Sequence, residues 1–249
     1  MCICIDCHWV DRCKAYHRVE TQHGEPHLAQ EPDFEPDQPR IHVSLRPIDQ
    51  SWGVEWDVQG CDSFGLALLD AGVVRSAEHP LGRDLSRGLL HAVEALLPAE
   101  RWTQLQWLAV ATGPGGFTGT RLSVVLARTL AQQLAIPLWG WGSFELIARR
   151  RAKDLSVQGP LWIGQTLPRR GVVAGQYALV NGDVEELKAP RLHRQGWEAL
   201  EGTCWEAEMR PELDAQLLLQ LGMDAAAAAS SGPWQLVLPQ YPTSPVAAP

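Results

Sequence analysis

The order of apolar and polar residues along the chain predicts a succession of strands and helices. Short apolar or alternating runs bounded by turn residues predict strands over residues 41–45, 54–58, 65–69, 73–77, 105–110, 161–163 and 177–180. Apolar residues spaced three and four apart predict helices over residues 86–97, 122–134, 143–152 and 211–221. Residues 14–40 are rich in Pro, Glu, Asp and His with little periodicity, which predicts extended or irregular structure. Strands 41–45 and 54–58 are expected to pair as a hairpin, with Arg46 to Gly53 as its turn.

A glycine-rich segment joins the predicted strand 105–110 to the predicted helix 122–134. A strand, a glycine-rich turn and a helix can bind phosphate, because backbone N–H groups converge at the positive end of the helix dipole. The segment has neither the Walker nor the dinucleotide spacing. A tight turn without a ligand is therefore an equal alternative from the residues alone. The candidate phosphate-binding residues are Gly113, Gly115, Gly116, Thr118, Gly119 and Arg121.

Four of the six cysteines lie within the first thirteen residues, at Cys2, Cys4, Cys7 and Cys13. The start has no signal-peptide pattern and the chain has no apolar run long enough to span a membrane, so we expect a cytoplasmic protein. In the cytoplasm, clustered thiols bind metal or take part in redox reactions more often than they form disulfides. Four thiolates suit an iron–sulfur cluster. Zinc is the other candidate, with His8, His17 or His23 as substitute ligands; a reduced tail without metal is the third reading.

Charge and composition limit the functions further. A net charge of −8 argues against strong RNA binding by the chain alone, because phosphate contacts need clustered Lys and Arg. His91 stands alone on the predicted helix 86–97, and the carboxylates Asp57, Asp62 and Asp70 are scattered. No nucleophile and base share a recognisable sequence pattern. We therefore expect no catalysis by the chain on its own.

The segment Gly113-Pro114-Gly115-Gly116-Phe117-Thr118-Gly119-Thr120-Arg121 resembles the signature of the TsaB family, departing from it at Gly116 and Thr120. The resemblance extends to segments 64–70, 81–90, 136–145 and 239–245, and so covers about residues 54–249. It implies an α/β fold of the actin-like, sugar-kinase-like (RNase H-like) class with two lobes. The first lobe is expected over residues 54–157 and the smaller second lobe over 158–249, after the break at Gln158-Gly159-Pro160.

TsaB proteins are non-catalytic partners of TsaD in tRNA threonylcarbamoyladenosine synthesis. The resemblance implies that this chain dimerises with TsaD and keeps it competent to modify adenosine 37 of tRNA. It further implies TsaE as a second partner, ATP or ADP at the interface with TsaD, only indirect contact with tRNA, and a homodimer when TsaD is absent. The helix over 86–97 and the helix after Arg121 would form the dimer face. Its expected contact residues are Leu89, Leu90, Val93 and Leu97.

The N-terminal region resembles a second family. Met1 to Cys7, Asp11-Arg12-Cys13 and Glu55-Trp56-Asp57-Val58 are similar to the small cysteine-rich plastid-frame proteins of cyanobacteria and algal plastids, over residues 1–64. This resemblance implies an iron–sulfur cluster and a role in photosynthetic electron transport, with residues 1–53 as the metal-binding module. Cys61 occupies the place of a family cysteine and is a fifth candidate ligand.

The two resemblances overlap at residues 54–64. Either a true fusion uses one strand for both modules, or the reading frame joins two neighbouring genes, and the sequence leaves both open. In this segment Val54, Trp56 and Val58 alternate with Glu55 and Asp57. That alternation suits a strand with one buried face better than a central strand buried on both.

Overall fold

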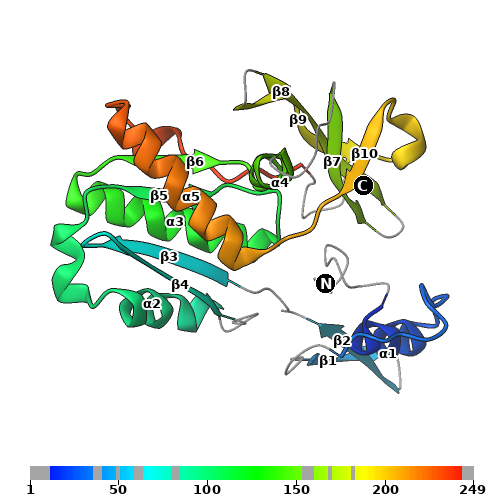
Figure 1. Ribbon diagram of the computed structural model, residues 1–249. Helices are drawn as coiled ribbons and strands as arrows, with labels where there is room; N and C mark the ends of the chain where they lie inside the picture. The colour runs from blue at the N-terminus through cyan, green and yellow to red at the C-terminus, as the bar shows by residue number, and fades with distance from the viewer. Residues whose placement is uncertain are drawn as a thin grey trace.

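The computed structural model describes residues 12–35, 41–48, 51–58, 64–79, 85–152, 160–167, 170–180 and 183–242. Figure 1 shows helices on both sides of short strands, with a larger sheet beside them. The helices are α1 (Lys14–His23), α2 (Leu85–Leu96), α3 (Phe117–Leu134), α4 (Ser143–Ala152) and α5 (Pro211–Ala227), with 3₁₀ turns at Ala99–Gln104, Trp197–Ala199 and Trp234–Leu236. The strands are β1 (Ile41–Ile48), β2 (Ser51–Val58), β3 (Phe64–Asp70), β4 (Val73–His79), β5 (Leu108–Ala111), β6 (Leu138–Trp141), β7 (Leu161–Leu167), β8 (Gly171–Val180), β9 (Asp183–His193) and β10 (Thr203–Glu206).

Helix α1 lies inside the region 14–40, so the prediction of extended or irregular structure is wrong for Lys14–His23. Residues 24–35 contain no helix or strand, as predicted, and residues 36–40 lie outside the described part of the chain. Tyr16 and Val19 are buried on one side of the helix, and Glu20 is buried with them. The Glu20 carboxylate accepts a hydrogen bond from the backbone N–H of Leu28, at 3.2 Å. A charged residue on the buried side breaks the apolar pattern, which explains why the sequence did not indicate a helix.

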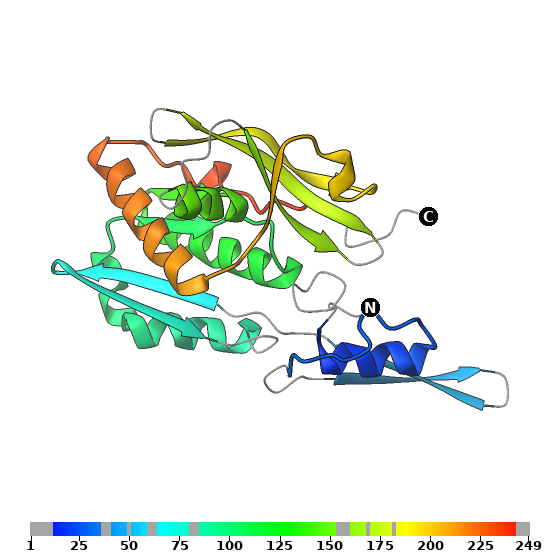
Figure 2. The same ribbon diagram turned by 45° about the vertical axis from the view of Figure 1, so that its right-hand side comes forward.

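The hairpin predicted over 41–58 is confirmed, but its strands are longer than expected. β1 and β2 pair antiparallel from Ile41 opposite Val58 to Ile48 opposite Ser51. The turn predicted over Arg46 to Gly53 is therefore wrong in extent. Helix α1 packs against β2, and both views show α1, β1 and β2 lying apart from the other elements (Figures 1 and 2). We refer to α1, β1 and β2 as the N-terminal unit.

The next part of the chain contains two separate strand pairs. β3 and β4 form an antiparallel hairpin through Ala71 and Gly72, both with positive φ. β5 and β6 pair in parallel and are joined by α3, which packs against both. α2 packs against β3 and β4, and α5 packs against β3, β4 and β5. The predicted elements at 65–69, 73–77, 86–97 and 211–221 are confirmed, although α5 continues to Ala227.

A four-stranded sheet in the order β10-β7-β8-β9 forms the remaining layer. β7, β8 and β9 are antiparallel neighbours, and β10 runs parallel to β7. Helix α4 packs across β7, β8 and β9 and forms the main core with them. The buried residues of this core are Phe144, Ile147, Ala148, Leu161, Ile163, Leu167, Val173, Tyr177, Val184 and Ala207.

The expected boundary between lobes, at Gln158-Gly159-Pro160, falls largely on residues 153–159, outside the described part of the chain. Helices on either side of it are tied together. Arg150 on α4 donates through Nε to Asp214 Oδ1 on α5 at 3.0 Å, and both side chains are mostly buried. No helix among the described residues is both long and apolar enough to cross a membrane.

Candidate functional site

The glycine-rich loop connects the end of β5 to the start of α3. Gly113 has a φ of +99°, and a Cβ there would lie 3.0 Å from the Gln240 carbonyl oxygen and 3.2 Å from Thr120 Cγ2. The Gly113–Pro114 peptide bond is cis. A side chain at Gly113 would thus be strained by the backbone conformation and crowded by two neighbours. Close packing alone accounts for a glycine at this position.

Backbone hydrogen bonds fix the loop to two other segments. The Ser143 N–H, at the start of α4, donates to the Gly113 carbonyl at 2.6 Å. The Gln240 N–H donates to the Thr112 carbonyl at 2.7 Å. The Phe117 and Tyr241 rings contact each other in a tilted arrangement, with centroids 4.7 Å apart. The segment Gln240-Tyr241 therefore holds the loop in place.

Helix α3 begins at Phe117, five residues before the predicted start at Leu122. Thr118, Gly119 and Arg121 consequently lie in the helix and not in the turn. Gly116 is the N-cap residue and makes no side-chain cap hydrogen bond. Thr118 and Arg121 are exposed. The positions of Thr118 and Arg121 do not test whether this loop binds a nucleotide, so nucleotide binding stays a prediction.

Gly115 is the other loop glycine with a close neighbour. It is exposed, and a Cβ on it would lie 3.0 Å from Thr120 Oγ1. Thr120 thus approaches both Gly113 and Gly115 from within α3. Its own N–H donates to the Gly116 carbonyl at 2.9 Å, the first hydrogen bond of the helix.

The expected dimer residues lie in different surroundings on α2. Leu89 and Leu97, just past the helix end, are buried at 6% and 7% exposure, whereas Leu90 is 50% exposed. Val93 is half-buried. On the neighbouring helix α3, Val125 is also 50% exposed. The sequence analysis does not single out Val125, because apolar spacing along a helix does not show which apolar residues stay exposed.

Among the five candidate metal ligands, only Cys13 lies in the described residues; Cys2, Cys4, Cys7 and Cys61 lie outside them. Cys13 is buried and is the N-cap residue of α1. One turn further along is His17, whose Nε2 is buried and has no hydrogen-bond partner in the described part of the chain. No group of three or more His, Cys, Asp or Glu suited to a metal ion occurs among the residues described.

An ion pair joins the end of β3 to the 3₁₀ turn before β5. The Arg101 guanidinium donates two hydrogen bonds to the Asp70 carboxylate, both at 2.9 Å. These bonds hold the pKa of Asp70 below its usual value. Asp70 is therefore an anchored carboxylate at neutral pH, with no proton to offer as an acid.

Comparison with known proteins finds relatives of the N-terminal region. The family model described as hypothetical chloroplast protein Ycf34 matches residues 1–68. An uncharacterized protein ycf34 of Pyropia yezoensis is 41% identical over 64 residues, 26% of this chain and 84% of that protein. The protein of the same description from Cyanophora paradoxa is 38% identical over 71 residues and is covered over 92% of its length.

A part of the remaining chain resembles proteins of tRNA modification. A family model described as TsaD, tRNA N6-adenosine threonylcarbamoyltransferase, matches residues 81–163. The tRNA threonylcarbamoyladenosine biosynthesis protein TsaB of Bacillus subtilis is 37% identical over 84 residues. That match spans 33% of this chain and only 35% of the TsaB protein.

Solved structures establish the fold. YeaZ from Pseudomonas aeruginosa matches 72% of this chain and 95% of its own length with a TM-score of 0.54 at 21% identity. A protein described as similar to peptidase YEAZ from the same organism matches 73% of this chain and 94% of its own, with a TM-score of 0.57. The predicted α/β fold is confirmed as YeaZ-like. Over residues 1–68 the chain belongs to the Ycf34 family, and this module is joined to a TsaB-like domain.

Proposed function

We propose that this protein is a partner subunit of TsaD in the synthesis of N6-threonylcarbamoyladenosine at position 37 of tRNA and does not catalyse the reaction alone. The observation that carries the proposal is the match of residues 81–163 to the TsaD family model, because this region contains α2, the glycine-rich loop and α3. The similarity to TsaB of Bacillus subtilis supports it further.

The proposed mode of action is the pairing of similar faces. A domain that resembles TsaD can pair with it through equivalent helices on the two proteins, as the subunits of a two-fold symmetric dimer do. Leu90 on α2 and Val125 on α3 are half-exposed apolar side chains on two helices that pack together. Burying a fully exposed apolar side chain of this size is worth about 1.5–3 kcal/mol, so both residues favour a docked state.

Loss of TsaD binding is expected when charge is placed on this face. In a pull-down of the full chain with TsaD from the same organism, the double variant Leu90→Glu/Val125→Glu should weaken binding about 100-fold or more, because each carboxylate would be buried unpaired. The matched control is Leu187→Glu on β9, since Leu187 is 43% exposed on a different sheet.

Two results would contradict the interface. One is undiminished retention of TsaD by the double variant; the other is an equal loss of TsaD by the Leu187→Glu control. Leu89→Asp is unsuitable as the main test, since Leu89 is buried and its replacement would also damage the core. TsaE as a further partner, a homodimer without TsaD, and ATP or ADP at the interface remain predictions from the resemblance.

A second candidate function is metal binding in the N-terminal unit. The buried Cys13 and the buried, unpartnered Nε2 of His17 are one helical turn apart on α1, as two ligands of one ion would be. A mixed thiolate and imidazole set fits zinc, and a set completed by further cysteines fits an iron–sulfur cluster. A bound cluster would supply one-electron transfer, and Cys13 and His17 would hold and orient it.

Metal content tests this second candidate. The protein purified anaerobically should contain iron with visible absorption, or zinc without it, and Cys13→Ser should lower the bound metal at least several-fold. His17→Ala should lower it as well if the imidazole is a ligand. Cys204→Ser is the matched control, because Cys204 is a partly buried thiol on β10, in the four-stranded sheet. Wild-type protein free of both metals would end this proposal.

A further inference from the structure

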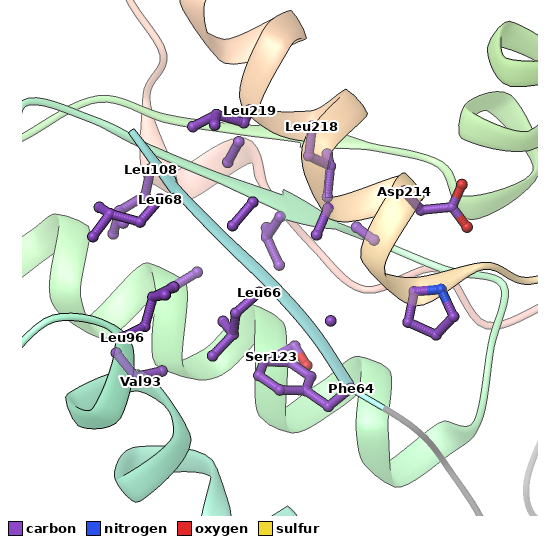
Figure 3. A pocket seen from close by; sticks show the side chains of 18 of the residues that line it. Phe64, Leu66, Leu68, Val93, Leu96, Leu108, Ser123, Asp214, Leu218 and Leu219 are labelled. Carbon is purple, nitrogen blue, oxygen red and sulfur yellow. The ribbon is translucent and has the colours of Figure 1, made fainter. Parts of the chain in front are cut away.

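Strands β3 and β5 each have one edge without a strand partner among the described residues. β3 pairs with β4 alone, and β5 pairs with β6 alone, so the two pairs form separate sheets. A cavity of about 920 Å³ lies between β3 and β5 and is lined by both strands and by α2, α3 and α5 (Figure 3). We refer to this space as the slot.

Many of the residues that line the slot are apolar, and β3 contributes several of them. All seven residues of β3 are only half-buried, although Phe64, Leu66, Leu68 and Leu69 are among them. Leu66 lies on the side of Val93 and Leu96, as Figure 3 shows. The slot is partly open to solvent, so the apolar side chains of β3 stay partly exposed, and an occupant would bury them.

The two facing edges indicate what kind of occupant fits. A strand edge carries backbone N–H and C=O groups that need partners, and an extended chain between two edges satisfies both. In Figure 3, Leu108 at the start of β5 and Leu68 towards the end of β3 lie at the same end of the slot, so the two strands run in opposite directions. A strand between them would be antiparallel to β3 and parallel to β5. A small apolar ligand would leave these backbone groups without partners.

We propose that the slot is a binding site for the chain's own segment Ser51–Val58, which forms β2 in the N-terminal unit. Only residues 59–63 separate Val58 from Phe64, and five residues are a common hairpin connection. A hairpin connection of this length would make the segment antiparallel to β3, as the slot requires. The eight residues of the segment also match the seven of β3 in length.

The apolar side of the segment fits this register. With Val58 opposite Phe64, Trp56 falls opposite Leu66, on the side of α2 and α3. Asp57 falls opposite Gly65, where the closest neighbour is Pro211, the first residue of α5. The apolar positions of the alternating sequence then lie on the apolar side of the slot that α2 and α3 form. The acidic positions fall on the side of α5, whose first turn already carries Glu212 and Asp214, so the fit of the segment rests on its apolar side and on backbone pairing with β3 and β5.

The segment can serve only one of its two positions at a time. In the N-terminal unit it pairs with β1 along one edge and is covered by α1. In the slot both of its edges would be taken, by β3 and β5. Pairing with β1 and occupation of the slot therefore exclude each other, and the Ycf34-like module competes with the TsaB-like domain for one strand. This inference is independent of binding to TsaD.

Breaking the β1–β2 pair tests the exchange in the full chain. Val43→Pro removes a backbone donor from β1, opposite Trp56 in the hairpin. Amide hydrogen exchange measured by mass spectrometry should then slow about tenfold or more in residues 64–70 and 108–111. Adding Trp56→Asp, which would put a charge on the apolar side of the slot, should abolish that protection. Unchanged or faster exchange in a folded Val43→Pro variant would overturn the proposal.

A peptide provides a second measurement that needs no variant to fold. A capped peptide of residues 51–58 should bind the wild-type chain with saturation at one equivalent, and the same peptide with Trp56→Asp should bind at least tenfold more weakly. No saturable binding of the first peptide at about 1 mM overturns the proposal. Protection that appears only with dimer formation, seen by light scattering, also overturns it, because the occupant would then be a second copy.

Discussion

Phe144→Ala is expected to lower the free energy of unfolding by about 3–5 kcal/mol, the usual cost of removing a buried aromatic ring. Phe144 is fully buried, at 0% exposure, in the core between α4 and the four-stranded sheet. Its neighbours in that core include Ile163 and Tyr177, which are also at 0% exposure. Because these side chains are packed on all sides, they can fill the resulting cavity only in part. Urea denaturation followed by circular dichroism measures the loss.

Two further variants locate the effect. Phe144→Leu retains most of the apolar volume and should cost clearly less than Phe144→Ala. Leu187→Ala on β9 should change stability by no more than about 0.5 kcal/mol, because Leu187 is 43% exposed. A Phe144→Ala variant as stable as Leu187→Ala would show that α4 does not form this core.

Elements with regular apolar spacing could be predicted from the sequence alone. The strands at 65–69 and 73–77 and the helices at 86–97 and 143–152 are found almost where the spacing places them. In the two helices, local pattern and final packing agree, since buried apolar residues such as Leu89 on α2 and Ile147 on α4 face the core. In β4 they agree less well, because Val73 and Val74 are exposed. The α/β fold follows from the resemblance to the TsaB family, which is centred on the segment from Gly113 to Arg121, and the solved YeaZ structures confirm it.

Other features depend on contacts between distant residues and could not be predicted. The start of α3 at Phe117 is one, because a glycine-rich sequence favours a turn until packing fixes it. Another is the backbone hydrogen bond from Gln240 to Thr112, which joins segments far apart in the sequence. The buried Glu20 is a third, since its burial depends on hydrogen bonds from residues beyond the helix.

The candidate interface shows the same limit within a single helix. Periodicity predicts which residues are apolar on α2, but it does not distinguish the side that meets the core from the side that remains open. Leu89 and Leu90 are adjacent and chemically identical, yet one is 6% and the other 50% exposed. The packing of α2 on β3 and β4 decides between them.

Gly65→Ala is expected to be the most damaging single-methyl change near the slot, lowering the free energy of unfolding by about 1–3 kcal/mol, the usual cost of overpacking. A Cβ at Gly65 would lie 2.1 Å from the Pro211 carbonyl oxygen and 2.4 Å from its carbon. These are backbone atoms at the start of α5, so no side chain can rotate away. The N-terminal end of α5 would have to move off β3.

Gly142→Ala is the matched control for this prediction. A Cβ at Gly142 would have its nearest neighbour, the Gly113 carbonyl oxygen, at 3.6 Å, an ordinary contact distance. Its unfolding free energy should therefore change little or rise slightly, because alanine restricts the unfolded chain more than glycine does. If urea denaturation gave the two variants equal stability, α5 would not lie against β3 as described. The side of the slot that α5 forms, and with it the site proposed for Ser51–Val58, would then have to be revised.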